Sequence, residues 1–113
     1  MTGKKLMKSL GVDAAAQEAF EREKKAGCVR VGFNIVVTEN WAYCDTGLTS
    51  VLLPLKEIKC FKKNYLPLRA YVSFYVILLF RSGERYALSC KFEEMDELAA
   101  IFTKHGAYPN EEL

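Results

Sequence analysis

The sequence of this chain predicts an α+β fold in which antiparallel strands are followed by a C-terminal helix. Three observations carry the prediction. Residues 70–92 alternate apolar and polar side chains on both sides of a Ser82-Gly83 turn, which is typical of a β-hairpin. Residues 93–105 instead repeat apolar side chains at helical spacing. Residues 14–26 consist almost entirely of good helix formers.

The first expected element is the helix over residues 14–26. Asp13 is placed to cap its N-terminus, and Gly27 suits the position after its last residue. Its apolar stripe is thin, so we expect a peripheral helix. The basic residues 1–10 ahead of it are predicted to be loosely ordered. Residues 1–27 are therefore expected to form an N-terminal helical extension.

Strands are expected through the middle of the chain. Four of them precede the long hairpin, and a loop containing Pro67 separates the last of them from it. The expected strands are residues 29–38, 41–45, 49–53 and 58–63, and the expected loop is residues 64–68.

The first strand of the hairpin has two unequal faces. Its even positions, from Val72 to Phe80, are all apolar and are predicted to form the folding core. Its odd positions, which include Tyr71 and Tyr75, are mixed and need a cover. Two covers stay open: an intramolecular helix, or a partner or second copy of the chain, because exposed aromatic patches mark interaction sites.

The order of these elements resembles a small bacterial pleckstrin-homology-like (PH-like) domain, from a family of unknown function. The resemblance depends on five features: Val31-Gly32, residues 37–41, residues 53–58, the Ser-Gly hairpin and the helix at residues 94–105. It implies an antiparallel barrel or roll over residues 28–106, followed by a polar tail at residues 107–113. We count about six strands, one fewer than the seven usual in PH domains.

Composition and charge limit the function. The 113 residues are 50% hydrophobic and 27% charged, as in one ordinary globular domain. A net charge of +2 is too small to indicate nucleic-acid binding. The charge is uneven, because residues 51–92 carry 8 basic and 2 acidic side chains whereas residues 93–113 carry 1 and 6. We recognise no secretory signal peptide and no membrane-spanning stretch, and we expect a cytoplasmic location, extending to the cytoplasmic face of a membrane.

Candidates for catalysis are sparse. His105 is the only histidine, and Cys28, Cys44, Cys60 and Cys90 form no C-x-x-C pair, so free structural thiols are expected. The common nucleotide-binding and hydrolase motifs do not occur. We therefore expect no enzyme activity, no cofactor and no metal. The alternative is a small enzyme with an unrecognised cleft.

The basic middle of the chain supplies the best binding candidates. Lys59, Phe61 and Lys63 are expected to share one solvent face. This surface would attract an acidic protein or an anionic membrane, whereas the alternative interpretation is that the lysines are solvated and protect strand edges from aggregation. The candidate residues are Lys59, Phe61, Lys62, Lys63, Tyr71 and Tyr75. The function hypothesis is a non-catalytic PH-like interaction module, with a self-associating structural domain as the alternative.

Overall fold

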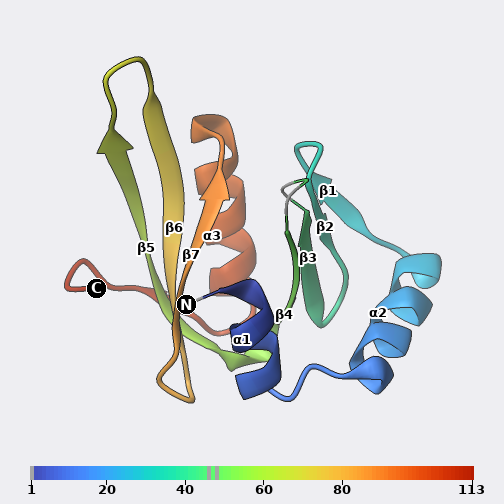
Figure 1. Ribbon diagram of the computed structural model, residues 1–113. Helices are drawn as coiled ribbons and strands as arrows, with labels where there is room; N and C mark the ends of the chain where they lie inside the picture. Colours follow the sequence, from blue (N-terminus) through green and yellow to red (C-terminus); the bar gives the residue numbers. More distant parts are fainter. Residues whose placement is uncertain (1, 46, 48) are drawn as a thin grey trace. The chain divides into compact units, whose positions relative to one another are not determined.

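The computed structural model describes residues 2–45, 47 and 49–113. The α+β class is confirmed. The chain divides into two compact units, Met1–Leu55 and Lys56–Leu113, and each contains one four-stranded sheet (Figure 1). We call these sheet A and sheet B.

In chain order the elements are α1 (Gly3–Ser9), α2 (Ala14–Ala26), β1 (Val29–Val31), β2 (Ile35–Val37), β3 (Trp41–Asp45), β4 (Ser50–Pro54), η1 (Leu55–Glu57), β5 (Ile58–Pro67), β6 (Val72–Phe80), β7 (Arg85–Cys90), η2 (Phe92–Glu94), α3 (Met95–Lys104) and β8 (Tyr108–Pro109).

Sheet A contains one strand more than expected. Its order is β1-β2-β3-β4, and every neighbouring pair is antiparallel. The predicted single strand over residues 29–38 is wrong, because the chain turns back at Gly32-Phe33-Asn34 and pairs Val31 with Ile35. Gly32 has a φ of +63°, a left-handed conformation that glycine adopts readily. Phe33 continues the apolar alternation and so conceals the turn, but it is exposed at the turn itself.

Two helices belong to the first unit. The prediction of a loosely ordered N-terminus is wrong for α1, which is capped by the Thr2 hydroxyl and buries Leu6 completely. The predicted α2 is confirmed with its cap, since the Asp13 carboxylate accepts from the Ala16 N–H at 3.0 Å. Although its apolar stripe is thin, α2 packs one face of sheet A through Phe20, which clusters with Val36 and Leu52.

Glu23 fixes α2 to the β2–β3 turn. Its carboxylate accepts from the Thr38 hydroxyl at 2.9 Å, from the Asn40 N–H at 2.8 Å and from the Asn40 side-chain amide at 2.9 Å. Burial acts to raise the pKa of Glu23, but these hydrogen bonds to the charged form outweigh it and lower the pKa. The carboxylate therefore serves as a structural acceptor.

Sheet B has the order β7-β6-β5-β8, in which β8 is parallel to β5 and the other pairs are antiparallel. The predicted loop at residues 64–68 is wrong, because β5 continues to Pro67 opposite Val72. Its alternation continues past the expected end, and Pro67 is tolerated because β8 pairs only with Cys60 and Phe61, which leaves the far end of β5 as an edge. Residues 108–109 of the predicted polar tail form β8, and Ala107 before it is buried.

The predicted core face of β6 is confirmed in its second half. Val76, Leu78 and Phe80 are buried, whereas Phe74 is half-buried and Val72 is exposed. The C-terminal helix is confirmed as α3, and it packs on β5 through Phe102, whose ring lies 5.8 Å from that of Phe61.

The predicted closed barrel is wrong. Both sheets are open: β1 and β4 each have one neighbour in sheet A, and β7 and β8 each have one in sheet B. β4 ends at Pro54, which has no N–H to donate, and the chain continues through η1 into sheet B without adding a strand to sheet A.

Candidate interaction surface

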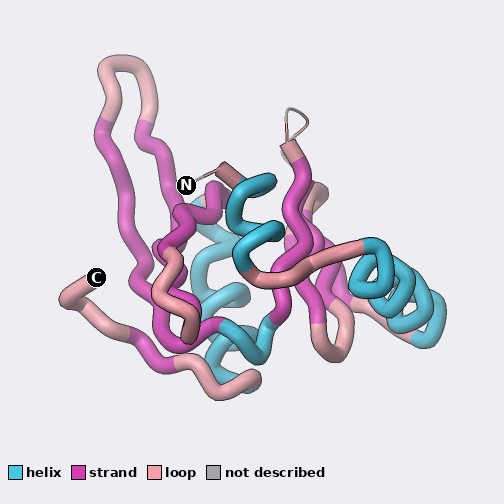
Figure 2. Tube along the Cα trace, turned by 60° about the horizontal axis from the view of Figure 1, so that its bottom comes forward, coloured by secondary structure: helices cyan, strands magenta, loops and turns pink. Residues whose placement is uncertain are grey.

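Large apolar side chains are exposed around the β5–β6 turn. We call residues 65–72 the hairpin tip. Its exposed members, between 42% and 64% accessible, are Tyr65, Leu66, Leu68, Tyr71 and Val72. The turn is closed by the Leu68 N–H, which donates to the Tyr71 carbonyl at 2.8 Å. This end of the hairpin extends beyond β7 and α3 in both views (Figures 1 and 2).

The tip is exposed because the cover on sheet B ends before it. Asp96 in the first turn of α3 reaches Lys63, and Phe92 in η2 reaches Phe74, with ring centroids 5.3 Å apart. Tyr65 lies opposite Phe74 in the ladder, so the hairpin tip begins at the level of this ring contact. The apolar side chains of the tip therefore stay exposed to solvent in the folded chain.

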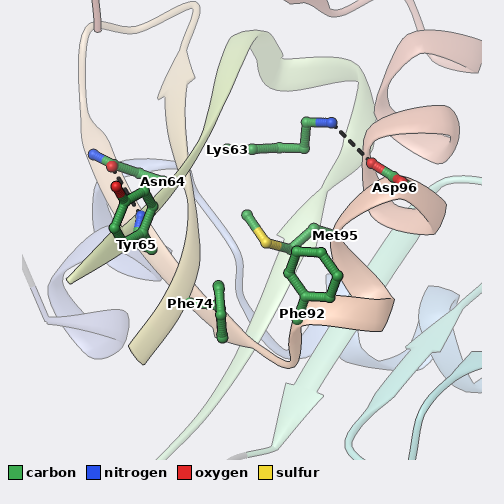
Figure 3. A pocket seen from close by; sticks show the side chains of 7 residues that line it. All are labelled: Lys63, Asn64, Tyr65, Phe74, Phe92, Met95 and Asp96. Carbon is green, nitrogen blue, oxygen red and sulfur yellow. Dashed lines mark hydrogen bonds and ion pairs between the residues drawn. The ribbon is translucent and has the colours of Figure 1, made fainter. Parts of the chain in front are cut away.

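A groove of about 340 Å³ lies where the hairpin meets the start of α3 (Figure 3). Its apolar wall combines Phe74, Phe92 and Met95; Met95 is buried, and Phe92 is 68% exposed. The Lys63–Asp96 ion pair, at 2.8 Å, forms its polar wall. The full lining is Lys63, Asn64, Tyr65, Phe74, Phe92, Met95 and Asp96.

The ion pair holds Lys63 in its charged form. The hydrogen bond to Asp96 and the charge of that carboxylate raise the pKa of Lys63, and the carboxylate of Glu111 adds to the effect. A lysine in this state is a poor base and a poor nucleophile.

The basic segment does not form the single solvent face that was expected. Phe61 and Lys63 do lie on one face of β5, but Phe61 is only 3% exposed and lies under Phe102 of α3, so the prediction that this face is exposed to solvent is wrong. A β-bulge between Ile58 and Cys60 shifts the register, and the helix covers the strand after it. Lys59 is exposed at this bulge.

The remaining candidates are divided between the two faces of sheet B. Antiparallel partners share a face, so Lys62 and Tyr75 lie on the face opposite the groove, and both are half-buried. Tyr71 is exposed in the hairpin tip. Tertiary structure thus brings only Lys63 into the groove and only Tyr71 to the tip.

The apolar residues of this surface were not recognised from the sequence. Leu66 and Leu68 were assigned to a loop because of Pro67, and Phe92 was placed on the return strand of the hairpin. One signal was available: residues 65–72 are dominated by apolar side chains and contain no acidic residue.

Two potentially reactive side chains of the second unit are Cys90 and His105. Burial, helped by the Glu94 carboxylate, raises the pKa of Cys90 to about 11, so this thiol stays protonated near neutral pH. His105 lies at the end of α3, where its Nδ1 is 2.9 Å from the Ile101 carbonyl. In the part of the chain that the structure describes, no three His, Cys, Asp or Glu side chains are grouped so as to hold a metal ion.

No protein-family model, no curated protein and no solved structure matches this chain. Among the described residues, no helix is both long and apolar enough to cross a bilayer. A function is therefore inferred from the geometry of sheet B.

Proposed function

We propose that this chain is a non-catalytic, PH-like interaction module that docks through its hairpin tip on an anionic membrane surface, at the cytoplasmic face. The observation that carries the proposal is the hairpin tip, which projects five exposed apolar side chains beyond the cover of α3. Contiguous exposed apolar surface of this kind marks an interaction site.

The PH-like assignment is supported by the strand count. Seven strands precede α3, four in sheet A and three in sheet B, and one helix follows them. The extra strand comes from the turn at Gly32, so the correction brings the chain closer to the seven strands of the resemblance.

A membrane surface suits the chemistry of the tip. Leu66, Leu68 and Val72 are aliphatic, while Tyr65 and Tyr71 have the amphipathic rings that favour the headgroup level. Arg69 is exposed within the turn, and no acidic residue occurs in residues 58–83. An exposed cation near an anionic leaflet contributes about 1 kcal/mol, so the apolar residues must supply most of the binding energy.

The non-catalytic part of the proposal is supported by the state of the candidate groups. Lys63 is engaged by Asp96, and the raised pKa of Cys90 keeps its thiol from acting as a thiolate nucleophile.

The test is co-sedimentation with vesicles of phosphatidylcholine alone and of an equal mixture with phosphatidylglycerol. We expect the native chain to sediment more with the anionic vesicles than with phosphatidylcholine alone, and high salt to remove this excess but not the apolar part of the binding. A Leu68→Ser, Tyr71→Ser variant should lose most of this binding. A Val29→Ser, Phe33→Ser variant is the matched control, because it removes exposed apolar side chains from the other unit.

Two outcomes would contradict the proposal. One is equal sedimentation of the tip variant and the control variant, which would remove the tip as the docking element. The other is no sedimentation of the native chain together with self-association that depends on Leu68 and Tyr71. In that case the tip would serve the alternative function, a self-associating structural domain.

A further inference from the structure

A second surface of sheet B is independent of lipid binding. We propose that the outer edge of β5, between β8 and Pro67, accepts an extended peptide as an added strand. The peptide that fits alternates apolar and acidic residues, with the apolar residues over the groove beside α3. The proposal depends on three features of β5. Its outer edge is open, one backbone N–H on that edge is bonded to a side chain and not to another strand, and the two faces of sheet B beside that edge differ in charge.

Only the first part of the β5 edge is paired. β8 lies opposite Cys60 and Phe61, and the Asn110 N–H donates to the Phe61 carbonyl at 2.8 Å. In the described part of the chain no other strand lies on this side of β5. Since the N–H and C=O of every second residue of an antiparallel strand point to the same edge, Lys63 and Tyr65 are next to face outward. Pro67 follows in this series and closes the edge, because it has no N–H.

The backbone N–H of Tyr65 is bonded to a neighbouring side chain. Its N–H donates to Oδ1 of the neighbouring Asn64 at 2.8 Å, as the dashed line between them in Figure 3 shows. In a paired strand this N–H would donate to a backbone carbonyl of the neighbouring strand. Here it donates to the Asn64 side chain instead. A peptide carbonyl has the same chemistry as the Asn64 acceptor and can replace it.

The groove selects an apolar residue at alternate positions of the peptide. Neighbouring residues in a sheet share a face, so peptide residues beside Lys63 and Tyr65 lie on the groove side. The groove is lined on this side by Tyr65 of β5 and, further from the open edge, by Phe74, Phe92 and Met95. Asp96 is on the same side but is paired with Lys63, so this face offers an acidic residue no unpaired cation.

The face of sheet B opposite the groove selects an acidic residue at the peptide positions between the apolar ones. Lys62 points away from the groove, and its pairing partner Ile77 carries no charge. Among the residues that the structure describes, no carboxylate forms an ion pair with Lys62. A peptide glutamate beside Lys62 thus gains a cross-strand charge pair that the described residues do not provide.

The probe is a short synthetic peptide of alternating leucine and glutamate, added to the ¹⁵N-labelled chain and followed by NMR. We expect the amide signals of Lys63 and Tyr65 to shift and their hydrogen exchange to slow, with little change along β7, the other edge of sheet B. A peptide of leucine and lysine should bind at least about tenfold more weakly, since it places like charges beside Lys62. A leucine–glutamate peptide with N-methylated backbone amides should also lose binding, because it keeps the side chains but cannot form the ladder.

Substitutions distinguish the contribution of the β5 edge to peptide binding from the contributions of the groove and of the hairpin tip. Phe92→Ala should weaken peptide binding by about tenfold, because it removes the exposed wall of the groove. Lys62→Glu should weaken it as well, whereas Lys59→Glu, the same charge change on the same strand, should not. Asn64→Ala should tighten binding a few-fold, because the peptide no longer competes with the Asn64 side chain for the Tyr65 N–H.

The outcomes are distinct from those of the lipid test. Equal affinity of the N-methylated peptide, or shifts confined to β7, would overturn strand addition on β5. Weaker binding by Asn64→Ala would overturn the competition at Tyr65. The Leu68→Ser, Tyr71→Ser variant should keep peptide binding while it loses vesicle binding, so failure of one proposal leaves the other intact.

Discussion

Sheet A and sheet B are built from similar alternating strands, yet the side chains of these strands are buried to different extents. In sheet A both faces are buried: Val51 and Leu53 on one face, and Val36 and Leu52 on the other, under Phe20 of α2. In sheet B the long β5–β6 hairpin is buried at its base and exposed at its tip. The difference teaches that alternation determines which face a side chain joins, whereas the length of the covering helix determines whether that face is buried.

The largest expected effect is the difference in stability between a substitution at the buried base of the β5–β6 hairpin and one at its exposed tip. Leu78→Ala should lower the free energy of unfolding by about 2–5 kcal/mol, because Leu78 is completely buried and its truncation leaves a cavity. Leu68→Ala at the tip should change it by less than about 0.5 kcal/mol. Urea denaturation of both variants measures this difference. Similar losses would mean that the tip is part of the folding core, which would remove the basis for its docking role.

The next effect concerns the attachment of α2 to sheet A. Glu23→Gln should lower the free energy of unfolding at neutral pH by about 1–2 kcal/mol, since the hydrogen bonds of a charged acceptor are lost but the site is partly screened by solvent. Because the folded-state pKa of Glu23 lies below its ordinary value of 4.5, the carboxylate stabilises the fold above that pH. This contribution is lost as the pH falls through the folded-state pKa.

The same pH dependence gives the measurement. Thermal unfolding of the native chain and of Glu23→Gln, recorded from neutral pH down through the acidic range, should give curves that converge as Glu23 becomes protonated. Lys24→Gln is a suitable control because its side chain is exposed on the same helix. A constant gap between the native and Glu23→Gln curves across this range would show that the charge of Glu23 does not matter.

The smallest effect tests where the cover on sheet B ends. Phe74 and Phe92 form the last ring contact before the tip, so a double-mutant cycle with Phe74→Ala and Phe92→Ala should give a coupling energy of about 0.5–1.5 kcal/mol. Urea denaturation of the two single variants and the double variant supplies the cycle. Strictly additive losses would mean that the rings do not support one another, and the apolar wall of the groove would then not be a single unit.

Local signals explain why both main helices were predicted with nearly correct ends. The Asp13 cap of α2 and Gly106 after α3, with a φ of +95°, each act within a few residues of the helix end. The turn at Gly32 and the helix α1 were missed for a common reason. Phe33 has the spacing of a core residue without being one, and Leu6 lies in a basic stretch whose few apolar residues show no clear helical stripe.

The candidate surface was predicted less well than the fold, because burial depends on contacts between distant segments. Lys63 looked like a free cation until Asp96, 33 residues later, was brought against it. Phe61 looked like an exposed aromatic until Phe102 covered it. Charge and alternation indicated the correct strand, but the residues available for binding lie further along it, at the tip.

The sequence by itself determined the α+β class, the position of the two main helices, the hairpin over residues 70–92 and the absence of acidic residues from residues 58–83, because these follow from local periodicity, capping and composition. Only the tertiary structure decided that the sheets stay open and that β5 runs on to Pro67. It also decided that α3 and η2 cover sheet B as far as Lys63 and Phe74. The physical reason is that pairing and burial are set by which distant residues meet, and alternation within one strand carries no information about its neighbours.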